Sequence, residues 1–97
     1  MIIPGKYLLF LGDVRDPLDA KTAFGLVDWA RERCAGQWRL PTCNVTLGLD
    51  DLDFAAARAA GAQTLVIGVT PFGGAIAPEW VAPIVAAIKT GLNVASG

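Results

Sequence analysis

Residues 64–69 read Thr-Leu-Val-Ile-Gly-Val, and this stretch decides the fold class of the chain. A short and almost wholly apolar run, with Gly61 before it and Pro71 after it, is typical of a strand buried on both faces. Strands of this kind belong to parallel sheets that helices cover on both sides. The stretch therefore predicts a buried parallel strand, and its neighbours in the sequence should supply the covering helices.

Similar signals lie on both sides of this strand. Further strands are predicted at Tyr7–Leu11, Asn44–Leu47 and Leu92–Ala95. Helices are predicted from Asp16 to about Arg33, from Asp50 or Asp51 to Gly61, and from near Pro78 to Gly91. In the third helix Trp80, Ile84 and Ile88 are spaced by four and are expected to share one face, while Pro83 either kinks the helix or marks its start. The stretch Cys34–Pro41 between the first helix and the second strand is predicted to be irregular.

These elements alternate in the order β-α-β-α-β-α-β. Short apolar strands separated by helices imply parallel pairing through right-handed crossovers. The predicted fold class is therefore α/β, a Rossmann-like three-layer αβα arrangement with a parallel sheet of about four strands. The length of 97 residues suits one domain, residues 1–97. Because no helix follows the last predicted strand, we expect this domain to be a fragment of a longer protein.

Composition limits the kinds of partner. Hydrophobic residues make up 54% of the chain and charged residues 18%, against about 25% charged in a typical domain. This excess favours a surface that meets another domain or a second copy, so a homo-oligomer is expected; an unusually apolar monomer is the alternative. With a net charge of −1 and no basic run, no nucleic-acid partner is expected. The apolar stretches are far shorter than the ~20 residues of a membrane-spanning helix. No secretory signal precedes them, and a cytoplasmic location is predicted.

Cys34 and Cys43 are predicted to be reduced, partly buried thiols. The chain has no histidine, and two cysteines alone make a poor zinc site, so no metal is expected. A redox or nucleophilic cysteine is the alternative, although no histidine of this chain could activate it.

Ligands of an open parallel sheet bind at the carboxyl ends of its strands, where three loops qualify. They are Gly12–Asp16, Gly48–Asp51 and Thr70–Ala75. Gly73 and Gly74 in the last loop either let an anionic ligand approach the backbone or only shape a tight turn. Asp13 and Arg15 in the first loop are expected to form an exposed ion pair, with a polar ligand as the alternative.

Two nucleotide motifs are incomplete. The residues after the first strand lack the glycines of G-x-G-x-x-G, which disfavours ordinary NAD binding. Lys21-Thr22 resembles the end of a P-loop but lacks the preceding glycines, so Lys21 is expected to be a helix-surface lysine. Of the three tryptophans, which all suit packing, Trp38 is the strongest candidate for an interface residue.

Three strings occur together in this chain. They are Tyr7-Leu-Leu-Phe-Leu-Gly-Asp13, Asp16-Pro-Leu-Asp-Ala-Lys-Thr-Ala23 with Gly25-Leu-Val-Asp-Trp29, and Thr64-Leu-Val-Ile-Gly-Val-Thr-Pro-Phe-Gly-Gly74. In combination they resemble the N-terminal domain of the DUF1611 family, which is associated with D-glutamate N-acetyltransferases of bacterial D-amino-acid catabolism. The resemblance covers essentially the whole chain.

The resemblance implies a two-domain protein in which this Rossmann-like domain is followed by a P-loop-type domain. That second domain would be the partner of this one and would hold acetyl-CoA or a nucleotide, with no cofactor in this domain itself. The implied reaction is acetyl transfer from acetyl-CoA to the amino group of D-glutamate. The positions implied to lie nearest the substrate cleft are Asp13, Lys21, Thr22, Gly73 and Gly74, while the catalytic residues remain unassigned.

Two functions follow from this. In the first, the chain is one part of an N-acetyltransferase, is inactive alone, and contributes to the substrate cleft and the domain interface. In the second, it is a non-catalytic domain for oligomerisation or ligand sensing, as the apolar excess would also suggest.

Overall fold

Four parallel strands form one sheet in the computed structural model, which describes residues 5–69 and 77–96. The strands are β1 (Lys6–Gly12), β2 (Cys34–Arg39), β3 (Ala62–Ile67) and β4 (Asn93–Ser96), in the spatial order β2-β1-β3-β4. The helices are α1 (Lys21–Ala30), α2 (Phe54–Ala59) and α3 (Pro78–Thr90), and the short 3-10 helices η1 (Pro17–Ala20) and η2 (Arg31–Arg33) flank α1. The predicted α/β alternation and the parallel four-stranded sheet are confirmed.

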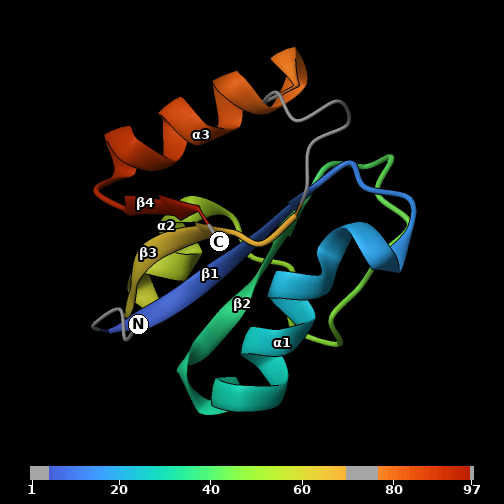
Figure 1. Ribbon diagram of the computed structural model, residues 1–97. Coiled ribbons are helices and arrows are strands. Elements are labelled where there is room, and N and C mark those ends of the chain that lie inside the picture. Colours follow the sequence, from blue (N-terminus) through green and yellow to red (C-terminus); the bar gives the residue numbers. More distant parts are fainter. Residues whose placement is uncertain (1–4, 70–76, 97) are drawn as a thin grey trace.

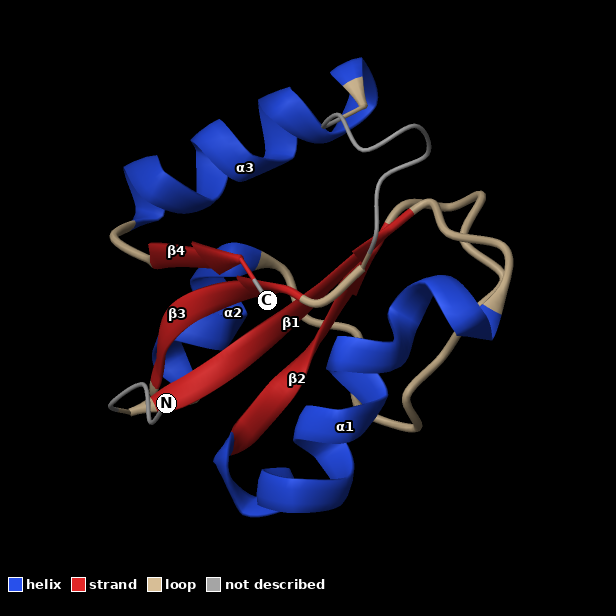
Figure 2. Ribbon diagram, in the orientation of Figure 1, coloured by secondary structure: helices blue, strands red, loops and turns tan. Residues whose placement is uncertain are grey.

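The helices lie on both faces of the sheet (Figure 1 and Figure 2). Phe10 of β1 forms a T-shaped pair with Trp80 of α3 and stacks on Trp38 of β2. Trp38 in turn stacks on Phe54 of α2, so α2 and α3 share this face. Tyr7 lies three residues before Phe10 and therefore on the opposite face, where it lines a groove with α1. The arrangement is the predicted three-layer αβα sandwich.

The core is centred on β1, whose residues from Tyr7 to Gly12 are all buried. On its α2–α3 face, four aromatic rings form a row with centroids 5.3 to 5.4 Å apart: Phe54, Trp38, Phe10 and Trp80. Such contacts contribute about 0.5–1.5 kcal/mol per pair beyond burial of their area. Trp38 is partly buried with its ring between two others of this row, so it packs within the fold, and its part in an interface stays a prediction.

The second strand is not at Asn44–Leu47, as the sequence pattern predicts, but at Cys34–Arg39 within the stretch predicted to be irregular. Val45 and Leu47 are buried and alternate with exposed neighbours, as residues of a strand would. However, their segment runs beside β2 and shares an isolated bridge with it, between Gln37 and Asp51. The alternation therefore reflects one buried side of an extended segment and not a ladder of paired strands.

The start of the second helix also differs from the prediction. Its cap is Asp53, whose Oδ1 accepts a hydrogen bond from the amide of Ala56 at 2.7 Å. Asp50 and Asp51 lie in the segment beside β2 instead. The predicted end is correct, since Gly61 follows the helix with a φ of +98°.

The first helix starts as predicted, with Asp16 as its cap and Pro17 at its first position, although its first turn is η1 and not α-helix. The third begins at Pro78, contains Pro83, and ends at Gly91, whose φ of 103° suits glycine.

One side chain of the third helix lies on another face than predicted. The face of α3 turned to the sheet carries Trp80, Ile84 and Ala87, whereas Ile88 is 54% exposed. The reason is the helical period of 3.6 residues, which returns to the same face after four and then three positions.

Candidate functional site

The candidate site lies at the carboxyl edge of the sheet, outside the ends of β1 and β3. These two strands are neighbours, and the chain leaves them in opposite directions, through α1 toward β2 and through α3 toward β4. Connections that diverge in this way open a crevice where parallel α/β sheets bind their ligands.

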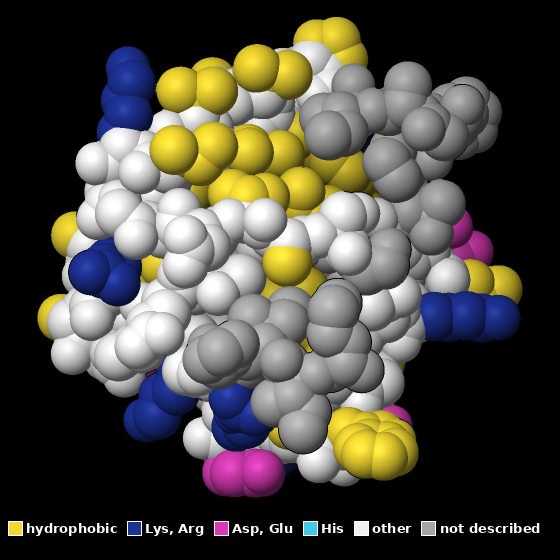
Figure 3. All heavy atoms as spheres, turned by 60° about the vertical axis from the view of Figure 1, so that its left-hand side comes forward, with side chains coloured by type: hydrophobic (Ala, Val, Ile, Leu, Met, Phe, Trp, Pro, Cys, Tyr) yellow, Lys and Arg dark blue, Asp and Glu magenta, His cyan; other side chains and the backbone are white. Residues whose placement is uncertain are grey.

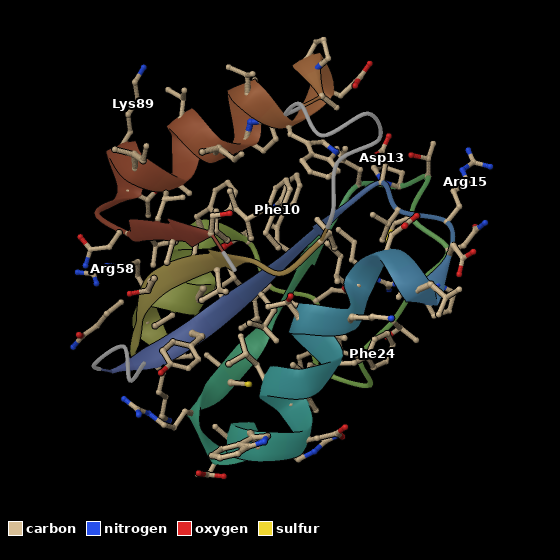
Figure 4. The ribbon with its side chains drawn as sticks, in the orientation of Figure 1. Phe10, Asp13, Arg15, Phe24, Arg58 and Lys89 are labelled. Atoms are coloured by element: carbon tan, nitrogen blue, oxygen red, sulfur yellow. The ribbon has the colours of Figure 1, made fainter. Side chains whose placement is uncertain are left out.

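Asp13, the first residue after β1, is held at this crevice by α3. The indole Nε1 of Trp80 donates a hydrogen bond to Asp13 Oδ1 at 2.8 Å. Trp80 is only 2% exposed, and a buried indole N–H needs an acceptor, so this bond fixes the direction of the carboxylate. Figure 4 shows Asp13 at this end of the sheet, beyond Phe10 of β1. Among residues 5–69 and 77–96, no donor bonds to Oδ2 of Asp13, and the residue is partly exposed.

The backbone around Asp13 is also fixed. Gly12 has a φ of +58°, and a Cβ there would lie 2.6 Å from the ring of Trp80, so only glycine admits this contact. The carbonyl of Gly12 accepts a hydrogen bond from the amide of Leu40 at 2.8 Å, and that of Val14 accepts one from Asn44 at 3.1 Å. Asp13 is thus preorganised, which lowers the cost of ordering it around a ligand.

The predicted ion pair between Asp13 and Arg15 is not formed. Asp13 faces the indole of Trp80, and Arg15 is exposed. Within the described part of the chain, the ion pair that does form joins Arg39 to Asp51.

Lys21 and Thr22, the next two predicted site residues, open helix α1. The amide of Ala23 donates to the carbonyl of Gly68 at 3.1 Å, which ties the first turn of α1 to the carboxyl end of β3. Gly68 has no room for a side chain, because a Cβ there would lie 2.7 Å from that of Ala23. Lys21 is exposed, as predicted, and lies at the same edge of the sheet as Asp13.

Thr22 belongs to a different hollow, a groove of about 590 Å³ between α1 and the amino-terminal part of β1. The groove is lined by Tyr7, Thr22, Gly25, Leu26, Trp29, Ala30, Glu32 and Arg33. Positions 22, 25, 26 and 29 follow one helix face, and Trp29 is 89% exposed beside it. The structure therefore places Asp13 toward α3 and Thr22 on the α1 face, and Asp13 does not line this groove.

The loop Gly48–Asp51, also predicted to border a ligand, does not follow the end of a strand. It lies beside Gln37 in the middle of β2, because β2 ends earlier in the sequence than predicted. Arg39 donates to Asp51 through Nε and Nη2, at 2.8 and 2.7 Å. These hydrogen bonds, with a weaker one from Gln37, hold the pKa of Asp51 below its ordinary value, although its partial burial opposes the shift. The carboxylate of Asp51 is therefore bonded to Arg39 and Gln37 within the fold.

Neither thiol is arranged as a nucleophile. Cys34 and Cys43 are free and half-buried, as predicted, and their Sγ atoms donate to the carbonyls of Ala30 and Val45. Burial raises the pKa of Cys34, although the nearby charge of Arg31 acts in the opposite direction. The raised pKa keeps the thiol protonated. Residues 5–69 and 77–96 contain no group of three His, Cys, Asp or Glu side chains placed to hold a metal. Helices long and apolar enough to cross a membrane are also absent from these residues.

Two of the predicted site residues, Gly73 and Gly74, lie outside the described residues. Sequence reasoning missed Trp80 as the partner of Asp13 and assigned it to packing. No local pattern of the sequence signals this contact, because the two residues are 67 positions apart.

A parallel sheet in this order, with its crevice between the two central strands, defines a Rossmann-like α/β domain. Comparison of the sequence with known families is more specific: residues 32–97 match DUF1611_N, described as a domain of unknown function and a Rossmann-like domain. The chain belongs to this family.

Two curated relatives extend the match to the whole chain. A protein named D-glutamate N-acetyltransferase from Tritonibacter scottomollicae is 48% identical over 96 residues, which is 99% of this chain and 29% of the relative. A second protein of that name, from Pseudoalteromonas sp, is 39% identical over 97 residues, again covering 29% of the relative. The chain therefore spans less than a third of the length of these relatives.

Proposed function

We propose that this chain is the Rossmann-like part of an enzyme that transfers an acetyl group to the amino group of D-glutamate, and that it binds the amino-acid substrate. Two relatives that carry this name match the chain from end to end, at 48% and 39% identity. The single structural observation that supports a substrate role is the fixed carboxylate of Asp13 at the crevice.

The substrate is a small dicarboxylate with one ammonium group. The carboxylate of Asp13, directed by Trp80, suits the ammonium group, because a charge-assisted hydrogen bond to a preorganised acceptor is strong and directional. Lys21 at the same edge suits a substrate carboxylate. Gly73 and Gly74, which the family resemblance also implies near the cleft, lie outside the described residues. Thr22 lines the groove on α1 and is left out of this set.

The reaction needs the amine in its neutral form. The bound ammonium group first loses one proton to solvent or to a base. Its nitrogen then attacks the thioester carbonyl of acetyl-CoA, the C–S bond breaks, coenzyme A leaves as its thiolate, and the second proton lost by nitrogen passes through a base to that thiolate. Asp13 is the carboxylate placed to orient that nitrogen. We assign the acetyl-CoA site to the part of the relatives that lies outside the match, which makes this chain inactive alone. A cytoplasmic location belongs to the same proposal.

The test uses a chimera in which this chain replaces the matching stretch of the Tritonibacter scottomollicae relative. Acetyl transfer to D-glutamate is followed by release of the coenzyme A thiol. We expect Asp13→Asn to lower kcat/KM about 100-fold, because it removes the charge that orients the amine. Trp80→Phe, which keeps the ring and removes the donor, should lower kcat/KM about tenfold and add little to the first variant.

The matched control is Asp28→Asn, an exposed carboxylate of α1 away from the crevice, which should leave kcat/KM unchanged. Equal activity of Asp13→Asn and this control would remove Asp13 from the site. By calorimetry, the chain alone should bind D-glutamate and acetyl-CoA weakly or not at all, and micromolar binding of either would contradict the assignment of the second site elsewhere.

A second function, self-association, is favoured by one observation. Trp29 is 89% exposed at the mouth of the groove on α1, and an aromatic side chain in this setting is typical of an interface. In this role the chain would form a homo-oligomer through the α1 face, with or without the acetyltransferase activity.

A further inference from the structure

The two edges of the sheet differ in whether the chain covers them. Along β2, the amide of Gln37 donates to the carbonyl of Asp50 at 2.9 Å, and the carbonyl of Gln37 accepts from Leu52 at 3.0 Å. These bonds use the outward-facing backbone groups of β2, so its edge cannot accept another strand there. We refer to the covering segment, residues 44–52, as the β2 strap.

The other edge is open. β4 pairs with β3 in a parallel register from Asn93 opposite Thr64 to Ser96 opposite Ile67. On its far side, no residue of the described part of the chain pairs with β4. Open strand edges are usually short, charged or covered, because their unpaired amides and carbonyls recruit other strands. β4 is short, but its residues 93–96 carry no charge.

An apolar stripe lies next to this edge. Val81, Val85 and Ile88 are 51, 42 and 54% exposed, and their spacing of four and three residues places them on one flank of α3. Val94 of β4 is 37% exposed on the same face of the sheet, as its register with the buried Leu65 shows. Figure 3 shows hydrophobic side chains gathered over α3 and beside β4. We call these four side chains the α3–β4 stripe.

We propose that the β4 edge and the α3–β4 stripe are the docking surface for one further strand–helix unit, supplied by the part of the relatives that lies outside the match. Its strand would pair in parallel with β4, and its helix would cover the stripe with an apolar face. The inference rests on the family membership of the chain and not on the proposed reaction.

The topology favours this occupant. The chain moves from β3 to β4 through α3, and a further unit that continues in the same direction with a right-handed crossover places its helix on the α3 face. Neighbouring helices of such a layer pack with axes about 8–10 Å apart, which brings the new helix onto the exposed flank of α3. A new strand can join the sheet at the β4 edge, whereas the strap closes the β2 edge at Gln37.

A second copy fits this surface less well. A stable interface between separate chains involves roughly 20–30 residues a side, and the stripe offers four side chains that are each about half exposed. A unit joined to the chain, or held to it by a larger domain, does not have to offset the full entropy of association. A small apolar surface is therefore enough for the proposed occupant and too small for a free dimer.

The experiment compares Val85→Asp in the 97-residue chain and in the chimera with the Tritonibacter scottomollicae relative. In the chain alone Val85 is exposed, so the melting temperature should change by less than about 2 °C. In the chimera the same charge would be buried, and the melting temperature should fall by at least about 5 °C. Hydrogen exchange of the Asn93–Ser96 amides should be at least about tenfold slower in the chimera than in the chain alone.

Leu18→Asp is the matched control, since Leu18 is 68% exposed on η1, at the other layer of the fold. Equal shifts for Val85→Asp in both proteins, or equal exchange of the β4 amides, would overturn the proposal. So would a dimer of the chain alone, seen by light scattering, that Val85→Asp converts to a monomer, because the occupant would then be a second copy. If the aspartate variant of the chimera does not fold, Val85→Thr tests the same contact with a smaller shift. None of these measurements depends on acetyl transfer, so failure of the proposed reaction leaves them interpretable.

Discussion

The two outer strands of this sheet differ in whether their outer edges are covered. β2 is covered by the strap, and its central residue Gln37 is fully buried. The side chain of Gln37 donates to Thr46 at 3.0 Å and to Asp51 at 3.1 Å, and it accepts from the amide of Leu47 at 2.8 Å. β4 has no such cover within the described residues, and its neighbour α3 exposes a row of branched apolar side chains.

The difference between the two edges shows that one buried polar side chain, Gln37, can hold a covering segment in place. The strap forms almost no ladder with β2, yet the amide group of Gln37 replaces the missing bonds and fixes the strap at three points. The β2 edge is therefore complete within this chain, and its stability should depend on Gln37. At β4 the exposed groups are apolar, and they contribute to stability only when a partner removes them from water.

The largest effect is expected from breaking the strap at Gln37. Gln37→Leu keeps the size of the side chain but leaves the buried amide of Leu47 without its partner and removes the hydrogen bonds to Thr46 and Asp51. A buried donor left unpaired costs about 1–3 kcal/mol, and the total loss should be about 3 kcal/mol. For a domain of this size that lowers the melting temperature by more than about 10 °C, measurable by circular dichroism.

Gln63→Leu serves as its control, because Gln63 is exposed on β3 and should tolerate the change within about 2 °C. A melting temperature of Gln37→Leu that equals that of the control would show that the strap is held by its apolar residues alone.

A smaller effect on stability is expected from Asp51→Asn, which weakens the ion pair between Arg39 of β2 and Asp51 of the strap. The side chains of Arg39 and Asp51 are 27 and 55% exposed, so solvent screens their interaction and the loss at pH 7 should be about 1 kcal/mol. The pKa of Asp51 is lower in the folded chain than its ordinary value of 3.8. The stabilisation is therefore present above that value and is lost as the pH falls through the lower, folded-state pKa.

Urea unfolding at several pH values measures this loss. The difference between the original chain and Asp51→Asn should be constant between pH 5 and pH 8 and should shrink below about pH 4. Asp28→Asn on α1 is the control variant for loss of an exposed carboxylate. A difference that stays constant down to pH 2 would rule out the ionised carboxylate as the source of the stabilisation.

The sequence predicted those elements whose own residues are enough to show that they are buried. β1 and β3 are continuous apolar runs, and a strand buried on both faces needs no other information. Gly61 and Gly91 marked helix ends correctly, since a left-handed cap is a local requirement. β2 escaped prediction because Gly36, Gln37 and Arg39 interrupt its apolar pattern. Gln37 is buried only because residues 46–51 supply its partners.

The same distinction applies to the candidate site. Asp13 follows β1 at the carboxyl edge of the sheet, as the order of strands and helices predicts, whereas substrate binding by Asp13 and Lys21 stays a prediction. The bond from Trp80 joins residues 67 positions apart, and no local pattern announces it. The groove beside Thr22 was missed for a similar reason, since the helix spacing of Gly25, Leu26 and Trp29 looks the same whether or not another element covers that face.

The smallest effect is expected at the open edge, where Val94→Lys places a charge on β4. If β4 is uncovered in this chain, the lysine remains in water, and the free energy of unfolding should change by less than about 0.5 kcal/mol in a urea titration. Val66→Thr, on the neighbouring strand and 2% exposed, shows the sensitivity of the measurement, with an expected loss of about 1–3 kcal/mol. A loss for Val94→Lys as large as that for Val66→Thr would mean that β4 is already covered. In that case both edges of the sheet would be covered within this chain. The contrast between the β2 edge, which the strap covers, and the β4 edge, which lies beside exposed apolar side chains, would not hold.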